Sequence, residues 1–474
     1  MNYLRLADIQ RDLATGSVNC TDLVDFYLGQ IESQKELNLF VEVYAEEARI
    51  QAKHIDQKLA AGTAGKLAGM VLGIKDVICY QSHGLTASSR ILKGFDSQFT
   101  ATALQRLLDE DVIIIGRQSC DEFAMGSSNE NSCYGPAHNP IDPSRVPGGS
   151  SGASAAAVAA NMCLASLGSD TGGSVRQPAS FCGVVGLKPT YGRISRWGLI
   201  AYGSSFDQIG PITRSAEDAA LLLQLMAGSD ERDNTSSRQA VNDYSKELTQ
   251  SGPFKVAYIK EALDSAGLDP EVRAAVYQTI EQLKEAGHEV QEVTFPLLEY
   301  LVPCYYILTT AEASSNLSRF DGIHYGHRSE KAKDLNEVYT MSRSEGFGEE
   351  VKRRIILGTF VLSAGHYDAY YTRAMKVRRL IRDATRSLLQ DCDMLLTPTA
   401  PTTAFPIGDK QDDPIAMYLS DIYTVHANLA GCPAISLPAA THSNGLPIGV
   451  QLMAGDFEEG KLLALARQLA NQTV

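Results

Sequence analysis

The chain has 474 residues, of which 44% are hydrophobic and 21% are charged, and this balance excludes collagen-like, coiled-coil and disordered proteins. Its formal net charge of −14 argues against a broad, sequence-independent grip on a nucleic-acid backbone by this chain alone. Nine scattered cysteines without C-x-x-C spacing are typical of reduced thiols. We therefore expect a globular protein of the bacterial cytoplasm or an organelle interior, with any nucleic acid held by a partner.

The N-terminal region, residues 1–65, is expected to be helical. Its first residues mix charges with leucines at helical spacing and lack the apolar run of a signal peptide. Thr21 is a candidate N-cap. A later helix places four residues close to one stripe: Ile50, His54, Ile55 and Leu59. No stretch of the chain reaches the ~20 apolar residues of a membrane span, so we expect no membrane contact.

Short apolar runs alternate with helical segments after residue 65. We predict strands at 70–74, 112–116 and 164–169, and a buried helix in the alanine-rich stretch 153–162. This alternation is typical of an α/β sheet protein. After the polar stretch 230–253, we predict a further strand at 254–260 and a helix at 269–287.

The C-terminal half begins with a mostly helical stretch over roughly 300–390, in which one long helix is expected from 367 to 389. Short strands are predicted after it, at 393–398, 434–438 and 448–453. Length alone suggests about three domains. One large α/β domain over 1–474, with a central mixed β-sheet flanked by helices and a helical insertion near 300–390, fits the pattern better.

Two glycine-serine clusters, at 148–152 and 172–174, flank the alanine-rich helix and the strand that follows it. Glycines let a backbone turn tightly and bring its N–H groups close to a substrate. A single such cluster is usually only a turn. The G-x-x-x-x-G-K-[ST] phosphate cradle is absent, and the G-x-S-x-G nucleophile elbow is not clearly matched.

Three motifs in order, GIKD at 73–76, GGSSG at 148–152 and DTGGSVRQP at 170–178, resemble the amidase signature family. The resemblance covers nearly the whole chain and implies a Ser-Ser-Lys triad of Lys75, Ser150 and the nucleophile Ser174. It also implies a cis peptide bond before Ser150. One departure is Ala153, where the family usually has glycine, and a positive φ at this position would strain the loop.

The chemistry of the triad follows from the residue types. An amide is a poor electrophile, so attack requires a deprotonated serine, donors for the oxyanion and an acid for the departing ammonia. No histidine lies near either glycine-serine cluster, and a neutral Lys75 is the alternative base. Neutrality near pH 7 requires the lysine pKa to fall by roughly three units, which burial can supply. Asp76 opposes that fall unless its carboxylate points to the other face of the strand.

The glycine-containing turn at 171–174 is expected to form the oxyanion hole, because consecutive backbone N–H groups can converge there on one oxygen. The backbone donors are those of Thr171, Gly172, Gly173 and Ser174. Ser151 is expected to be the N-cap of the alanine-rich helix. His324 and His327 lack neighbouring ligands in the sequence, so we expect no metal site.

Within the family, stretches such as 122–140, 184–214 and 421–438 resemble the A subunits of aspartyl/glutamyl-tRNA amidotransferases. This resemblance implies a glutaminase that supplies ammonia for Glu-tRNA(Gln), Asp-tRNA(Asn) or both. It implies B and C subunits as partners, with ATP, Mg and most tRNA contacts in the partner and no cofactor in this chain. It also implies a glutamine pocket of Arg354, Asp421 and Tyr305, and only one of Arg353 and Arg354 can face it. A stand-alone amidase and a non-catalytic scaffold remain the alternatives.

Overall fold

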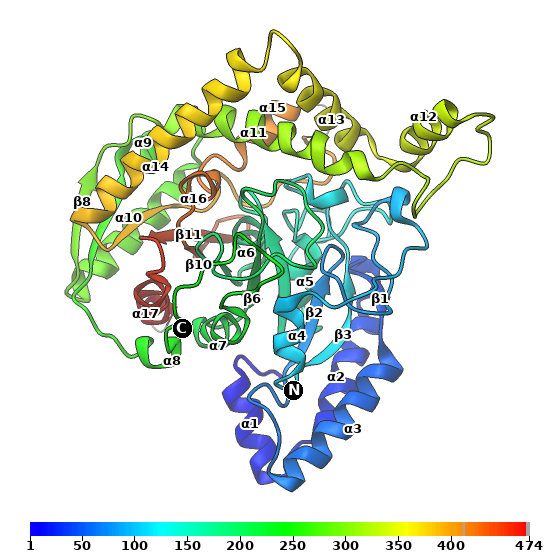
Figure 1. The fold of residues 1–474 in the computed structure, drawn as a ribbon. Coiled ribbons are helices and arrows are strands. Elements are labelled where there is room, and N and C mark those ends of the chain that lie inside the picture. The colour runs from blue at the N-terminus through cyan, green and yellow to red at the C-terminus, as the bar shows by residue number, and fades with distance from the viewer. Residues whose placement is uncertain (411–412, 471–474) are drawn as a thin grey trace.

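In the computed structural model the chain folds around one sheet of eleven strands, and the structure describes residues 1–410 and 413–470 (Figure 1). The order across the sheet is β1-β3-β2-β4-β6-β5-β10-β11-β9-β7-β8. The strands are β1 (Phe40–Val43), β2 (Val71–Lys75), β3 (Ile113–Gln118), β4 (Ala165–Asp170), β5 (Val185–Lys188), β6 (Gln208–Thr213), β7 (Lys255–Ile259), β8 (Glu289–Val293), β9 (Met394–Pro398), β10 (Ala434–Thr441) and β11 (Pro447–Ala454).

The sheet mixes both kinds of pairing. β2 runs parallel to both β3 and β4, and β7 runs parallel to both β8 and β9. The strands between these groups, and the edge strand β1, pair antiparallel. The expected single α/β domain with a central mixed sheet is therefore confirmed. Strands β2, β3 and β4 are buried on both faces, which explains their continuous apolar runs in the sequence.

Helices cover the sheet and extend beyond it. They are α1 (Leu6–Thr15), α2 (Cys20–Ser33), α3 (Ala45–Ala61), α4 (Thr102–Leu108), α5 (Gly152–Ala159), α6 (Arg176–Cys182), α7 (Ala216–Met226), α8 (Tyr244–Glu247), α9 (Lys260–Leu263), α10 (Pro270–Glu285), α11 (Leu301–Asn316), α12 (Leu335–Gly346), α13 (Glu349–Leu362), α14 (Arg373–Asp391), α15 (Pro414–Leu419), α16 (Val425–Ala430) and α17 (Glu459–Ala470).

The N-terminal helices differ from the sequence prediction in two details. Asn19, and not Thr21, caps α2: its side chain accepts from the backbone N–H of Asp22, and Asp22 accepts from the Asn19 N–H in return. The stripe predicted on α3 is wrong, because Ile50 is 68% exposed and the buried positions of that helix are Ala48, Ala52 and Ile55. Small alanines let α3 pack closely against α2.

The strands β1, β5, β6 and β8 were not predicted. β6 has the sequence QIGPIT, in which glycine and proline resemble a turn, yet it lies inside the sheet between β4 and β5. β8, EVQEV, is a polar edge strand beside β7. Their pairing partners lie far away in the sequence, so local patterning does not reveal them.

Helices α11, α13 and α14 lie together on one side of the molecule, far from the N-terminal helices α1–α3 (Figure 1). α14 starts later than predicted, because residues Asp368–Thr372 form a π-helical turn before it. In the part of the chain that the structure describes, we find no helix with the length and apolar character needed to cross a membrane.

Candidate active site

The polar residues of the candidate site start from the carboxyl ends of two neighbouring parallel strands. β2 ends at Lys75 and β4 ends at Asp170, and the two strands pair in the register Ile74 to Leu167. Loops that follow the carboxyl ends of parallel strands meet at one edge of a sheet. The turn before α5 and the turn before α6 therefore face the end of the Lys75 side chain.

Lys75 is fully buried and surrounded by serine oxygens. Its ammonium nitrogen lies 2.6 Å from the Ser150 hydroxyl, 2.9 Å from that of Ser151 and 3.0 Å from that of Ser169. Burial lowers the pKa of Lys75 from 10.5 to about 8, and nearby groups that include Asp121 and Asp170 limit the fall. The lysine is thus half neutral near pH 8 and neutral in a smaller fraction of molecules at pH 7, and the fall is somewhat less than the roughly three units that neutrality near pH 7 requires.

Asp76, the next residue, points away from the lysine. Its carboxylate accepts from the Arg117 guanidinium at 2.5 Å and from the backbone N–H groups of Thr86 and Ser88 at 2.9 and 2.7 Å. Because successive side chains along a strand point to opposite faces, the Asp76 carboxylate lies away from the Lys75 ammonium. This is the condition under which a lowered lysine pKa is expected from the sequence. Asp76 belongs to a buried network that fixes the end of β2.

The peptide bond between Gly149 and Ser150 is cis, as the family resemblance implied. The turn leads directly into α5, in which Ala153 has a helical conformation and donates its N–H to Asn129. Alanine therefore causes no strain at this position. The N-cap prediction for Ser151 is wrong in one respect: Ser151 precedes α5, but its hydroxyl makes no capping bond and instead contacts Lys75 and the Ser169 carbonyl.

Ser174 lies beside this group in the turn between β4 and α6. Its carbonyl oxygen accepts from the Ser151 N–H at 3.0 Å, which links the two turns. Among the described residues its hydroxyl has no hydrogen-bond partner, and the residue keeps 8% exposure in an otherwise buried turn. The backbone thus holds Ser174 next to Ser150 and Ser151 while its hydroxyl is free to react.

The turn itself is held by buried charge. Asp170 pairs with Arg176 at 2.9 Å and also accepts from the Gly173 N–H at 2.9 Å. Gly173 has a φ of +127°, and a Cβ built there would lie 2.2 Å from the Thr424 hydroxyl. Only glycine fits this position without displacing Thr424.

The four backbone amides expected at the oxyanion hole are not equivalent. The Gly173 N–H is already donated to Asp170, whereas the N–H groups of Thr171, Gly172 and Ser174 have no acceptor within residues 1–410 and 413–470. The Thr171 hydroxyl donates to the buried Asp207 at 2.6 Å. Three amides of this turn thus remain available to a ligand.

Tyr305, on α11, packs directly against the same turn. A Cβ on Gly172 would lie 2.4 Å from the Tyr305 hydroxyl, so the absence of a side chain at Gly172 makes room for the tyrosine. The ring is buried and contacts the rings of Phe206 and Tyr306 edge-on. The α11 helix therefore forms one wall of the site.

Arg354 and Arg353 differ in burial, but both line the same cavity, so the expectation that only one of them can face the pocket is wrong for this cavity. The Arg354 side chain is 3% exposed, while that of Arg353 is 50% exposed. Arg354 donates to Glu350 at 2.8 Å and to the Tyr202 hydroxyl at 2.7 Å. It lies over three aromatic rings, and a cavity of about 370 Å³ lies against it. Arg354 is thus the buried cation of a cavity whose lining contains both basic and acidic side chains.

Asp421, between α15 and α16, is the buried acid of the same region. It accepts from the Ser127 hydroxyl at 2.6 Å and from the Tyr306 hydroxyl at 3.3 Å. Burial raises the pKa of Asp421 to about 7, although Ser127 and Arg354 act in the opposite direction. A ligand cation at this carboxylate would favour its ionised form.

Several residues that build the site were not found by sequence reasoning. Ser169 contacts Lys75, Glu350 holds Arg354, and Ser127 and Tyr306 hold Asp421. Spacing on α13 could have suggested Glu350, because it lies one helical turn before Arg354. The other contacts join distant segments. Among the described residues no group of three or more His, Cys, Asp or Glu side chains could hold a metal ion.

Known proteins resemble this chain over its whole length. The family model for Amidase matches residues 22–463. The A subunit of glutamyl-tRNA(Gln) amidotransferase from Chlorobium phaeobacteroides is 50% identical over 477 residues, which span 100% of both chains. The crystal structure of the corresponding A subunit of glutamyl-tRNA(Gln) amidotransferase from Thermotoga maritima is 41% identical with a TM-score of 0.78, covering 94% of this chain and 90% of that one.

A solved structure named for a different substrate has the same fold. The native peptide amidase from Stenotrophomonas maltophilia is 29% identical, with a TM-score of 0.83, and the match covers 99% of this chain and 96% of that one. The similarity therefore includes both a component of an amidotransferase and an amidase named for peptide substrates.

Proposed function

The chain belongs to the amidase family, and from that premise we propose that it is the glutamine-hydrolysing A subunit of a tRNA-dependent amidotransferase. The observation that carries the proposal is the fully buried Lys75, 2.6 Å from Ser150, in a chain 50% identical over its full length to a protein of that name. In its neutral form this lysine can accept, through Ser150, the proton that Ser174 releases when it attacks a substrate amide.

The proposed reaction begins with attack of the Ser174 hydroxyl oxygen on the carboxamide carbon of glutamine. The Ser174 proton passes to Ser150, and the Ser150 proton passes to neutral Lys75. The same relay returns a proton to the leaving nitrogen, so ammonia departs and a γ-glutamyl ester remains on Ser174. Water then attacks the ester and releases glutamate.

The oxyanion that forms in each step needs donors positioned in advance. In this proposal the backbone amides of Thr171, Gly172 and Ser174 supply them. Because Gly173 N–H is donated to Asp170, its amide orients the turn while the amides of its neighbours face the oxyanion. Buried Asp170 and Arg176 keep the turn rigid.

Glutamine carries an α-carboxylate and an α-ammonium, which require one cation and one anion. We assign the carboxylate to Arg354, the ammonium to Asp421 and a hydroxyl contact to Tyr305. Tyr305 and Arg354 both come from the helical segment near 300–390, so this segment completes the substrate pocket. The depth of burial of both charges supports selection for a free amino acid.

Transfer of the ammonia requires partners. We propose B and C subunits, with the B subunit supplying ATP, Mg and most tRNA contacts, because this chain has a net charge of −14 and lacks a P-loop motif. Ammonia is easily lost to solvent, so a passage from the Ser174 pocket into the partner is part of the proposal. The complex would be located in the bacterial cytoplasm or an organelle interior.

Ammonia release from glutamine, measured with the purified chain and with the chain plus B and C subunits, tests the proposal. We expect a stable complex and glutamine as the preferred amide. Hydrolysis of many amides by a chain that binds neither partner would instead identify a stand-alone amidase. Partner binding without any ammonia release would identify a scaffold.

A further inference from the structure

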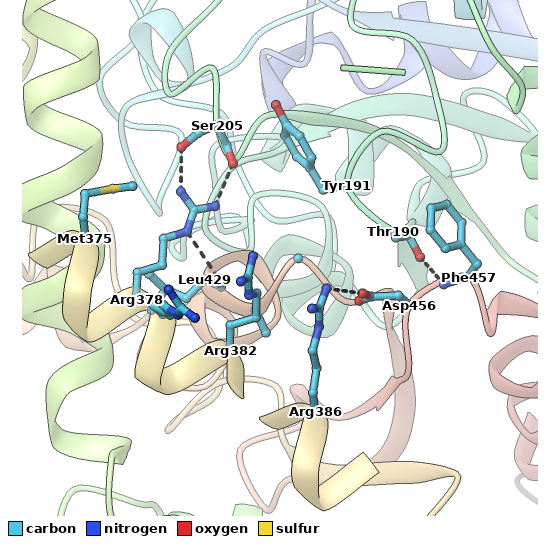
Figure 2. Close-up of a pocket in the computed structure, with 13 residues that line it drawn as sticks. Thr190, Tyr191, Ser205, Met375, Arg378, Arg382, Arg386, Leu429, Asp456 and Phe457 are labelled. Carbon is cyan, nitrogen blue, oxygen red and sulfur yellow. Dashed lines mark hydrogen bonds and ion pairs between the residues drawn. The ribbon is translucent and has the colours of Figure 1, made fainter. Parts of the chain in front are cut away.

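A basic groove runs along α14, and we define it by Arg378, Arg379, Arg382 and Arg386. Its cavity volume is about 600 Å³, and Tyr191, Gly431 and Phe457 contribute to its other walls. Figure 2 shows the labelled arginines extending from α14 toward the segment that carries Thr190 and Tyr191. Its lining shares no residue with the candidate active site. The groove therefore needs an explanation of its own.

One of the four arginines is fixed in place. The Arg378 guanidinium donates to the Ser205 hydroxyl at 2.8 Å and to the Ser205 carbonyl at 2.9 Å. It also lies 3.9 Å from the centroid of the Phe206 ring. These contacts join α14 to the loop that carries Ser205, so the groove has a rigid wall before any ligand binds (Figure 2).

The other three arginines lie on one face of α14, since they occupy positions i, i+3 and i+7. Arg379 and Arg382 share one carboxylate, that of Asp383, at 3.5 and 3.8 Å. Arg386 pairs with Asp456 at 2.5 Å. Glu312, which accepts from Ser205, is the acidic neighbour of Arg378. Four guanidinium groups thus meet three carboxylates, which leaves a local excess of one positive charge in a chain of net charge −14.

The donors of this face are largely unused. Among the described residues, neither Arg379 nor Arg382 makes a side-chain hydrogen bond, and their side chains are 78% and 44% exposed. An arginine row on a convex surface would be satisfied by water alone. Here the row borders a cavity of the size that small ligands occupy, so several guanidinium groups can reach one ligand.

We propose that the basic groove is a binding site for a phosphate-bearing anion. A phosphate monoester carries up to two negative charges and three acceptor oxygens, so it can bind two or three arginines at once. A carboxylate has one charge and two oxygens, and the three carboxylates already present leave one guanidinium charge unbalanced. The phosphate can belong to a free organic phosphate or to an RNA backbone.

The test uses the purified full-length chain and two probes, inorganic pyrophosphate and a fluorescein-labelled single-stranded RNA of roughly 12 nucleotides, at about 50 mM salt. Calorimetry measures the first and fluorescence anisotropy the second. The variants are Arg382→Gln alone and Arg379→Gln combined with Arg382→Gln. Lys376→Gln, which removes a charge from an exposed position of α14 outside the groove lining, is the matched control.

We expect saturable binding of at least one probe, weakened about fivefold by the single change and more than about twentyfold by the double change. Lys376→Gln should alter it less than twofold. Pyrophosphate binding without RNA binding identifies a free phosphate ligand, and RNA binding that pyrophosphate displaces identifies the backbone.

Three results would overturn the proposal. These are the absence of saturable binding of both probes, equal effects of the double variant and the control, and tighter binding of a hexaglutamate peptide than of either probe. The last result would assign the groove to an acidic protein segment. Circular dichroism spectra must match the parent chain, and Arg379→Gln alone replaces any variant that fails this check. The proposal does not depend on glutaminase activity, because the two sites share no residue.

Discussion

The ammonium nitrogen of Lys75 lies 2.6 Å from the Ser150 hydroxyl, although 75 positions separate the two residues in the chain. The contact is buried, and two more serine hydroxyls complete the surroundings of the lysine. Among the described residues no carboxylate forms an ion pair with this lysine, and the more distant Asp121 and Asp170 only limit the fall of its pKa. Its proton is therefore more easily lost than that of an ion-paired lysine.

Replacement of the nucleophile tests the triad. Ser174→Ala should lower ammonia release from glutamine by roughly four orders of magnitude, because members of a catalytic triad act as a unit. Ser154→Ala is the matched control, since Ser154 is a buried serine of α5 whose hydroxyl has no partner among the described residues. A Ser174→Ala chain that keeps a tenth of the parent rate would rule out the assignment.

The pH dependence of the reaction should follow Lys75. Because its pKa in the folded chain is about 8, the lysine is charged and inactive as a base below this value and neutral above it. The glutaminase kcat/KM should therefore rise with pH, with a midpoint near 8, between pH 6.5 and 9. A profile that is flat across this range, measured in buffers of equal ionic strength, would contradict a lysine base.

Gly173 should not tolerate a side chain. Gly173→Ala places a Cβ against Thr424 at a φ of +127°, so the turn must move and its amides lose their alignment. Turnover should fall by about two orders of magnitude while the chain still folds. Gly94→Ala is the control, because Gly94 also has a positive φ but no atom near its Cβ position. Equal turnover in both variants would disprove the proposed oxyanion turn.

The two neighbouring arginines of α13 should behave differently. Arg354→Lys keeps the charge but loses the planar fork, so the KM for glutamine should rise about tenfold or more with a smaller change in kcat. Arg353→Lys should change KM less than twofold, because that side chain is half exposed and a lysine can keep its ion pair with Glu350. Steady-state kinetics measure both values, and equal KM values in the two variants would show that Arg354 does not bind the α-carboxylate of glutamine.

The sequence by itself determined the fold class, the buried strands β2, β3 and β4, the helix α5 and the position of Lys75 at a strand end. Apolar runs and alanine-rich stretches report burial locally, and they need no knowledge of distant partners. The order of the lysine and glycine-serine motifs was enough to identify the family. The assignment of Arg354, and not Arg353, to the glutamine carboxylate came from the family resemblance.

The tertiary structure decided which groups surround each functional side chain. Ser151 contacts Lys75 and does not cap α5, Glu350 and Tyr202 hold Arg354, and the Gly173 amide is donated to Asp170. The tertiary structure also decided where the unpredicted strands β1, β5, β6 and β8 form. Their places, like most of these contacts, depend on the order of strands in the sheet and the packing of distant helices, and local periodicity carries no information about either.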